Sequence, residues 1–372
     1  MYFAMIYKKL YKNWFILIVA PFLLSLSVNG QSFNWVKTAG GTGHDIGTKV
    51  CMDGNGNIYA TANAGGGGNF VTFLNDTFNI NGLGDIFLTK YDLSGNELWT
   101  KQFGGNNIGT NPYYGEGFSA LLFDSLNNCL YLAGQFYGTI TFDSISLIAG
   151  SGGTDDFIAK FDLNGNCQWA KHISSVGSHR APVLALDQVG NIYAMGALSD
   201  SGSINVALIV PGIYLAKMNA SGNLLSISKV GDWNWQYNSP SFVYGEMCYS
   251  RDRLYILGAC FDTLTIDTIH LSSVNSQYSQ VLTTWDTLGR IIWARNSIDA
   301  NTFDGTFEVD LDGNSYIMNS FQAPWIRFDN DTVFSDGNTG GYIMKYDVNG
   351  NLVWINSIEV GQPFSPKCSA IN

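Results

Sequence analysis

Basic residues are scarce in this sequence of 372 residues, which has 19 Lys and Arg against 30 Asp and Glu and a formal net charge of -11. Nucleic-acid binding requires clustered Lys and Arg that neutralise phosphates. No such cluster is present, and no apolar run after residue 28 is long enough to span a bilayer. These deficits argue against nucleic acid as a partner and against a membrane span in the mature chain.

Recognisable catalytic motifs are missing as well. The four histidines form no HxH or HExxH spacing, so a zinc site has little local support. There is no glycine-rich phosphate loop with Lys and Ser or Thr, and no GxSxG nucleophile elbow. We therefore expect neither a metal nor a cofactor, and the sequence favours a protein that is not an enzyme.

The N-terminus carries the features of a secretory signal. Three lysines precede the fifteen-residue apolar run 14–28, and small or medium side chains stand before a plausible cleavage point at Gln31. An uncleaved membrane anchor is the alternative, but the run is short and contains Pro21. We expect a signal peptide over 1–30 and a secreted or cell-surface domain over 31–372, whose formal charge becomes 16 minus 30, or -14.

One hairpin recurs five times, and this repeat is the strongest signal in the sequence. Its copies read "DIFLTKYDLSGNELW", "DDFIAKFDLNGNCQW", "IYLAKMNASGNLL", "VLTTWDTLGRIIW" and "YIMKYDVNGNLVW". A second hairpin precedes each copy, and its tyrosines are spaced by 61 to 72 residues: Tyr59, Tyr131, Tyr193, Tyr255 and Tyr316. A period of this size is typical of a propeller or a solenoid.

Each repeat is predicted to hold four antiparallel strands, A to D, with Asp-x-x-Gly-Asn turns between A and B and between C and D. In strand C of the second repeat, Phe157, Ala159 and Phe161 face one way, and Ile158 and Lys160 face the other. Both faces are largely apolar, so each sheet should lie between two others, as propeller blades do. We therefore expect an all-β fold, a β-propeller of four-stranded antiparallel blades, with five complete repeats and partial blade elements at both ends.

Two recurring residue types have a functional and a structural interpretation. A tryptophan ladder on strand D could stack on sugars, but packing between neighbouring blades explains its recurrence better; its members are Trp99, Trp169, Trp293 and Trp354. The turns at Asp53 and Asp310 resemble calcium loops but lack the closing Glu. We expect packing residues and plain hairpin turns.

The six cysteines invite a disulfide interpretation in an exported chain. Cys51 and Cys248 fall at equivalent positions of the first and fourth repeats, which places them apart. Cys129 and Cys167 share one repeat, but another strand should separate them. Free, buried thiols are therefore expected.

The segment "GTITFDSISLIAGSGGTDDFIAKFDLNGNCQWAKHIS" resembles the repeat of bacterial secreted β-propeller proteins of the SBBP kind, which are related in pattern to NHL propellers. The resemblance covers residues 33–372 and is carried by the pattern "G-x-D-x-F-x-A-K-x-D-x-x-G-N-x-x-W". Such proteins are common among those exported by type IX secretion systems, so the resemblance implies a fold and export more than an activity. The third repeat departs from the pattern at Ser226, which replaces the tryptophan, and the C-terminal sorting domain of many relatives is absent.

The two ends of the chain do not complete a blade. Residues 33–41 match strand D, whereas residues 364–372 match strand A. Strands A and D are not neighbours in a blade, so strands B and C between them are missing. We expect that the sequence is truncated and that the native ring has six or more blades; an open or imperfectly closed ring of five blades is the alternative.

Long connections should gather on one face, because the B-to-C and D-to-A connections are long and the turns at the other face are tight. Binding is usually placed on such loops. Aromatic residues of two D-to-A connections are the candidate binding residues for a glycan or an extracellular protein: Trp233, Trp235, Tyr237, Tyr113 and Tyr114. Rings that pack onto the neighbouring blade are the alternative.

An extracellular hydrolase or lyase is the second functional hypothesis. Carboxylates from several blades could meet at the central channel, and Asp124, Asp187 and Asp310 at the ends of A strands are the first candidates. Turn capping is the structural explanation for the same residues. Channel carboxylates with strongly perturbed pKa values would favour the enzyme over a binding or structural module.

Overall fold

The computed structural model describes residues 35–358, except for 66–67, 69, 74–75, 83, 106–116, 151–152, 233–234, 237–238, 241, 262, 267–268, 273–277, 299–300, 303–304 and 338. Within these residues the repetitive secondary structure is β-strand throughout, so the expected all-β class is confirmed. None of them belongs to a helix that is long and apolar enough to cross a membrane. Residues 1–30, the expected signal peptide, lie outside the described part.

Five antiparallel sheets, called sheets 1 to 5, follow one another along the chain, and each is built on four strands in sequential order. Sheet 1 contains β2 (His44–Met52), β3 (Ile58–Gly65), β6 (Gly84–Tyr91) and β7 (Glu97–Phe103). Sheet 2 contains β8 (Gly117–Asp124), β9 (Cys129–Tyr137), β12 (Thr154–Asp162) and β13 (Cys167–Ser175). Sheet 3 contains β14 (His179–Leu186), β15 (Ile192–Leu198), β18 (Gly212–Met218) and β19 (Leu224–Gly231).

Sheets 4 and 5 follow the same order. Sheet 4 contains β22 (Phe242–Ser250), β23 (Arg253–Phe261), β26 (Tyr278–Asp286) and β27 (Ile291–Asn296). Sheet 5 contains β29 (Thr306–Val309), β30 (Ser315–Gln322), β33 (Gly340–Tyr346) and β34 (Leu352–Ile358), and the short β28 (Asn301–Thr302) also pairs with β30. Each sheet therefore corresponds to one of the five sequence repeats.

In every repeat, the chain forms a small hairpin after the second strand of the sheet and before the third. These hairpins are β4 (Phe70–Phe73) with β5 (Asp76–Asn79), β10 (Thr139–Phe142) with β11 (Ile145–Ile148), β16 (Gly202–Ile204) with β17 (Ala207–Ile209), β24 (Thr263–Ile266) with β25 (Ile269–Ser272), and β31 (Trp325–Phe328) with β32 (Asp331–Phe334). Two further short pieces are β1 (Ala39–Gly41), which pairs with β4, and β20 (Trp235–Gln236), which pairs with β21 (Ser239–Pro240). The hairpin of one repeat can reach the last strand of the preceding sheet, as β16 does with β13.

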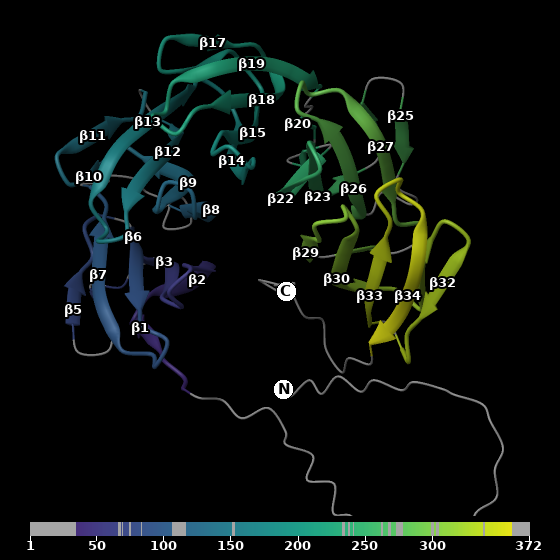
Figure 1. Ribbon diagram of the computed structural model, residues 1–372, viewed down its shortest axis with the longest axis horizontal. Coiled ribbons are helices and arrows are strands. Elements are labelled where there is room, and N and C mark those ends of the chain that lie inside the picture. Colours follow the sequence, from purple (N-terminus) through teal and green to yellow (C-terminus); the bar gives the residue numbers. More distant parts are fainter. Residues whose placement is uncertain are drawn as a thin grey trace, which may run out of the picture.

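The five sheets stand around a common centre in an arc (Figure 1). The first strand of each sheet, hereafter its inner strand, faces this centre: β2, β8, β14, β22 and β29. The last strand of each sheet lies at the periphery. The arc begins at sheet 1 and ends at sheet 5, with an opening between these two sheets.

The apolar core lies between neighbouring sheets. One cluster joins Tyr59 of sheet 1 to Leu121 and Phe157 of sheet 2. Equivalent clusters join sheets 2 and 3, sheets 3 and 4, and sheets 4 and 5. Sheets 2 to 4 therefore bury both faces, which explains why their strands are apolar on both sides.

The Asp-x-x-Gly-Asn turns are held by hydrogen bonds to their first residue. In the turn between β2 and β3, the backbone N–H groups of Asn55 and Asn57 each donate to Asp53 Oδ1 at 2.9 Å, and the Asn57 amide donates to Oδ2 at 2.7 Å. Gly56 has a φ of 82°, in the left-handed region that favours glycine. The carboxylate of Asp310 is engaged in the same way. These bonds support hairpin turns over calcium loops at both aspartates.

The strand-D tryptophans pack between sheets. Trp169 Nε1 donates to the Ala220 carbonyl oxygen at 3.3 Å, and Trp293 Nε1 donates to the Val348 carbonyl oxygen at 3.1 Å. Each acceptor lies in the turn before the last strand of the following sheet. Trp293 is buried, and Trp99, Trp169 and Trp354 are half-buried. The ladder therefore serves packing, as expected.

Candidate functional site

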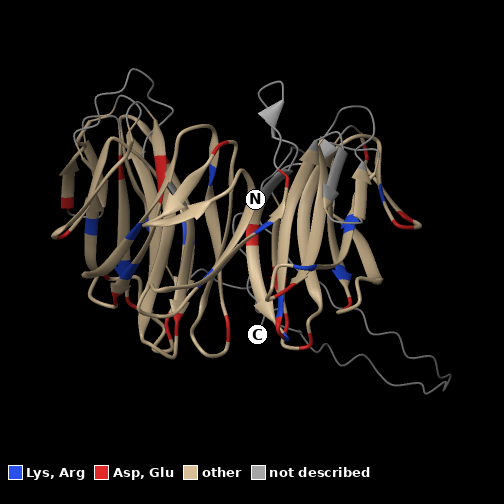
Figure 2. Cartoon of the chain, turned by 90° about the horizontal axis from the view of Figure 1, so that it is seen from above, with Lys and Arg blue, Asp and Glu red and all other residues tan. Residues whose placement is uncertain are grey.

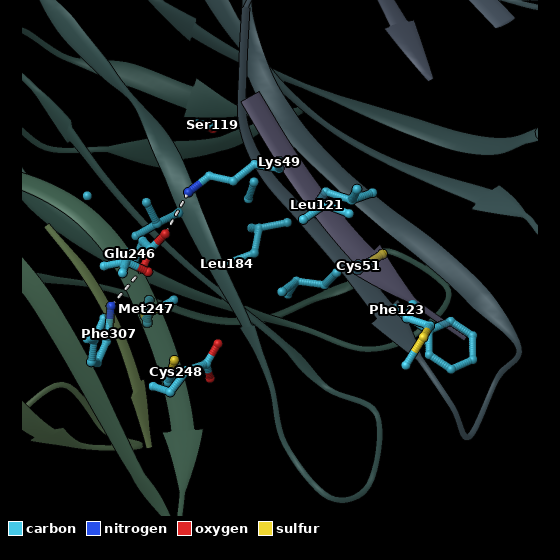
Figure 3. A pocket seen from close by; sticks show the side chains of 18 residues that line it. Lys49, Cys51, Ser119, Leu121, Phe123, Leu184, Glu246, Met247, Cys248 and Phe307 are labelled. Atoms are coloured by element: carbon cyan, nitrogen blue, oxygen red, sulfur yellow. Dashed lines mark hydrogen bonds and ion pairs between the residues drawn. The ribbon is translucent and has the colours of Figure 1, made fainter. Parts of the chain in front are cut away.

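A cavity of ≈ 420 Å³ lies where the inner strands converge on the centre of the arc (Figure 3). Its wall is largely apolar and includes Leu121, Leu184, Met247 and Phe307, one from each of four sheets. The polar side chains of the wall are Lys49, Ser119, Glu246, Thr306 and Glu308. The cavity is thus an apolar chamber with a few polar groups, the usual composition of a small-ligand site.

An ion pair crosses this cavity. Lys49 on β2 lies 3.1 Å from Glu246 Oε1 on β22, with side chains 24% and 21% exposed. The other carboxylate oxygen, Oε2, accepts hydrogen bonds from the Thr306 hydroxyl and the Phe307 backbone N–H, each at 3.3 Å (Figure 3). Glu246 therefore links three sheets, because its partners come from sheets 1 and 5.

Two thiols face the same cavity, Cys51 on β2 and Cys248 on β22. Burial, and secondarily the charge of Asp53, raises the pKa of Cys51 to about 12. Burial raises the pKa of Cys248 well above its ordinary value. Both thiols are protonated near neutral pH, and a protonated thiol is a poor nucleophile. Cys51, Cys129, Cys167 and Cys248 form no disulfide.

The three aspartates considered for channel chemistry cap turns instead. Asp124 Oδ1 accepts from the backbone N–H groups of Leu126 and Asn127 at 2.9 and 3.0 Å. Burial opposes ionisation of Asp187 and Asp310, but hydrogen bonds to their carboxylates outweigh it and lower both pKa values. Such carboxylates stay ionised and engaged, which makes them poor general acids or bases near neutral pH.

Figure 2 shows acidic residues at the tips of the turns along one rim of the molecule. This is the rim of the tight A-to-B and C-to-D turns. The candidate aromatic residues stand in two D-to-A connections of the sequence. Trp233, Tyr237, Tyr113 and Tyr114 lie outside the described residues; Trp235 lies in β20, where its backbone pairs with Pro240, but its side chain is not described.

The structure brings together a group of residues that the sequence analysis missed. On β12, Asp155 Oδ2 lies 2.7 Å from His172 Nε2, and Asp156 Oδ1 lies 3.0 Å from His179 Nδ1. His179 Nε2 is 2.8 Å from the Thr154 hydroxyl. The His179 side chain is 3% exposed and that of Asp156 is 0% exposed. His179 begins β14, so this buried pair joins sheet 3 to sheet 2.

The ionisation of this pair follows from its burial. Burial raises the pKa of Asp156, although His179 opposes the shift. For His179, burial disfavours the charged form, but hydrogen bonding and attraction to Asp156 outweigh it and raise the pKa. The sequence signal was the Asp-Asp pair of "TDDFIAKF", placed at the start of an otherwise apolar strand. Charged residues are seldom buried unless they are paired.

Among the described residues, no group of three or more His, Cys, Asp and Glu side chains is placed to hold a metal ion. No family model matches the chain, and no curated protein matches it. Among solved structures, it is similar to a polysaccharide lyase, the PL25 ulvan lyase, with 10% identity, a TM-score of 0.44 and coverage of 84% of this chain and 85% of that chain. It is also similar to a protein of unknown function from Bacteroides caccae, with 12% identity, a TM-score of 0.34 and coverage of 81% and 95%.

Proposed function

We propose that this protein is a secreted or cell-surface β-propeller that serves as a rigid binding or structural module. The five sheets act as its blades, residues 1–30 direct its export, and residues 31–372 form the domain. The observation that carries the proposal is the arrangement of five equivalent sheets around one centre (Figure 1). Such a scaffold holds its connecting loops at fixed positions, where binding is usually placed.

The chemistry of the cavity supports binding or structure over catalysis. Both oxygens of Glu246 are engaged, by Lys49 and by two donors of sheet 5. The thiol of Cys51 is held protonated by burial. The carboxylates of the turn aspartates accept hydrogen bonds from backbone N–H groups. Glu246 and Cys51 face the central cavity and the aspartates cap turns, and none of these groups presents the unengaged carboxylate or the thiolate that a general base or nucleophile needs.

The ligand is a glycan or an extracellular protein, bound at the rim of the long connections. The motif "WNWQYN", residues 233–238, alternates aromatic rings with amide side chains. Aromatic rings stack on sugars, and Trp and Tyr are frequent hot spots in protein interfaces. Tyr113 and Tyr114 stand in another of the long D-to-A connections of the sequence.

The binding proposal is tested with a panel of glycans and bacterial surface proteins. The double variant Trp233→Ala/Trp235→Ala should lose at least tenfold in affinity for any panel member that the wild type binds. Leu311→Ala is the matched control, because Leu311 is 91% exposed in a turn of the opposite rim. Equal affinity of all three proteins for the panel member would show that Trp233 and Trp235 are not part of the binding site.

An extracellular hydrolase or lyase is the second candidate, because Glu246 and Glu308 line the same cavity. Two carboxylates in one cavity are the minimum set for glycoside hydrolysis. Suppose that the wild type cleaves a polysaccharide and that Glu246→Gln abolishes the cleavage while circular dichroism shows an intact fold. The protein would then be an enzyme of this kind and not a binding module. Cleavage that persists in Glu246→Gln would place any activity elsewhere.

A further inference from the structure

The hairpin of β31 and β32 in sheet 5 has one buried face and one exposed face. Its buried face packs into the core between sheets 4 and 5 and consists of Ile326, Phe328 and Val333. Successive side chains of a strand point to opposite faces, so the residues that alternate with these three point away from the core. We call this outward face the hairpin platform, and its four exposed residues are Trp325, Arg327, Thr332 and Phe334.

Trp325 and Phe334 form an aromatic pair on the hairpin platform. They stand directly opposite each other in the antiparallel ladder, so their Cβ atoms lie about 4.5–5.5 Å apart. Trp325 is 36% exposed and Phe334 is 71% exposed. Figure 1 shows β32 at the periphery of the molecule, on the outer side of β34. Two neighbouring aromatic side chains in contact with water are typical of an interaction site.

The fold does not require aromatic residues at these two positions. The same first pair of the ladder is Thr139 with Ile148 in the hairpin of β10 and β11. That hairpin also buries its other face, where Ile140 is 0% exposed. An aromatic pair is therefore not needed to attach a hairpin to its sheet, and packing does not explain the pair on the hairpin platform.

Backbone hydrogen bonds hold the hairpin platform in place. The Ile298 N–H, after the last strand of sheet 4, donates to the Arg327 carbonyl oxygen at 2.8 Å, and the Arg327 N–H donates to the Ile298 carbonyl oxygen at 3.1 Å. At the open end of the hairpin, the Ser335 N–H donates to the Pro324 carbonyl oxygen at 2.9 Å. A ligand therefore meets a surface that is already ordered, which lowers the entropic cost of binding.

Arg327 supplies the only charge among the four residues of the hairpin platform. Its guanidinium carbon lies 6.0 Å from the centre of the Trp325 ring, so the cation stands beside the aromatic surface. A guanidinium binds a carboxylate through two parallel N–H donors. The two acidic residues of the hairpin, Asp329 and Asp331, belong to its tip, where Asp329 lies 3.9 Å from Arg295. The charge of the hairpin platform is therefore complementary to an anionic ligand.

We propose that the hairpin platform binds an acidic polysaccharide whose sugars carry carboxylate groups. The apolar faces of its sugar rings stack on Trp325 and Phe334, and a sugar carboxylate pairs with Arg327. This inference rests on the proposed function, because it takes the ligand to be a glycan. It places the glycan on the hairpin of a B-to-C connection, whereas Trp233 and Trp235 belong to a D-to-A connection.

Isothermal titration calorimetry of the full chain tests the proposal with three polysaccharides rich in uronic acid, namely polygalacturonate, alginate and hyaluronan, and with neutral dextran. We expect the wild type to bind at least one of the three at least tenfold more tightly than dextran, and this binding should weaken with added salt. Phe334→Ala and Arg327→Gln should each lose at least tenfold in affinity for that polysaccharide. Arg327→Gln should also lose the preference over dextran.

Two matched controls should bind like the wild type. Ile148→Ala is the control for Phe334→Ala, because Ile148 holds the same ladder position in the hairpin of β10 and β11 and is 68% exposed. Arg290→Gln is the control for Arg327→Gln, because the Arg290 side chain is 75% exposed in a turn of sheet 4. Hydrogen exchange of the unsubstituted chain is a check without mutation: slower exchange of peptide 322–336 with the polysaccharide bound supports the proposal, and unchanged exchange there contradicts it.

Other outcomes separate this inference from the proposed function. Polysaccharide binding that persists in Phe334→Ala and Arg327→Gln but is lost in Trp233→Ala/Trp235→Ala would overturn the inference and leave the proposed function intact. Equal affinity of the wild type for dextran would overturn the acidic class of ligand. If the hairpin variants lose affinity for a bacterial surface protein and no polysaccharide binds, the hairpin platform is a protein interface and the inference is wrong. A wild type that binds no glycan and no surface protein would contradict the proposed function itself.

Discussion

Lys49 and Glu246 form an ion pair of 3.1 Å although they are 197 residues apart in the sequence. The pair joins sheet 1 to sheet 4 across the central cavity. Each side chain is about three-quarters buried, so the charges are only partly screened by water. The pair therefore braces sheets that are not neighbours in the arc.

Replacing Lys49 with methionine should lower the free energy of unfolding by about 1–2 kcal/mol, because the Glu246 carboxylate keeps its burial and loses its charged partner. Urea unfolding measures the change. Lys229→Met is the control, since the Lys229–Asp232 pair is exposed on both sides and its loss should change stability by less than about 0.5 kcal/mol. Equal changes in the two variants would show that the cavity pair is not a brace.

The Asp156–His179 pair predicts a pH dependence of stability. Both folded-state pKa values are raised, so both groups bind protons more tightly in the folded protein. The contribution of Asp156 is fully present below its ordinary pKa of 3.8 and that of His179 below its ordinary 6.5, and each is lost as pH rises through that group's own raised pKa. The unfolding free energy should therefore fall as pH rises above 6.5, the ordinary pKa of a histidine.

Urea unfolding at several pH values checks this prediction, and Asp156→Asn removes the carboxylate that raises the pKa of His179. In that variant the fall above pH 6.5 should flatten, whatever the change in absolute stability. If the unfolding free energy of the variant falls with pH as steeply as that of the wild type, other groups cause the pH dependence.

Trp293 should be among the most important packing residues. It is 7% exposed, and its ring packs against Gly350 of the following sheet. Trp293→Ala should cost about 3–5 kcal/mol of unfolding free energy, because it opens a cavity between sheets 4 and 5. Trp325→Ala, at a tryptophan that is 36% exposed, should cost less than about 1 kcal/mol. A small effect at Trp293 would contradict the packing role of the ladder.

Gly222 is predicted to be intolerant of a side chain. It has a φ of 74°, and an added Cβ would lie 2.6 Å from Lys171 Cε and 3.0 Å from the Trp169 ring. Gly222→Ala should lower the thermal unfolding midpoint, at a cost of about 1–3 kcal/mol for strain and contact. Gly54→Ala meets nothing within 4 Å and should leave the midpoint unchanged. Similar midpoints in the two variants would count against close packing of this turn on the Trp169 ring.

The sequence predicts best what is encoded within a few residues. The turn at Asp53 is closed by Asn55 and Asn57, so its pattern can be read locally and recurs in the other repeats. The packing role of Trp293 is also predictable, because recurrence at one position of each repeat implies one structural environment. Residues 33–41 were assigned to strand D, and the bond from Trp35 to Leu93 agrees with that assignment.

Contacts between repeats were not predictable in this way. Lys49 and Glu246 occupy positions whose equivalents in other repeats carry different side chains, so no periodic pattern identifies the pair. Asp156 meets His179 only because sheets 2 and 3 pack face to face. The aspartates considered for channel chemistry were again a local matter: Asp124 and Asp187 lie near the ends of inner strands, and their carboxylates accept turn hydrogen bonds, as the turn-capping interpretation expects.

Hydrogen exchange with a bound glycan or surface protein from the panel tests the central claim most directly, because it locates the binding rim without a mutation. We predict slower exchange in the peptide spanning residues 231–242 and in the other long connections, with no change in the turn peptides 53–57 and 310–314. Slower exchange confined to the turn peptides, or confined to the strands that line the central cavity, would contradict a binding face formed by the long connections.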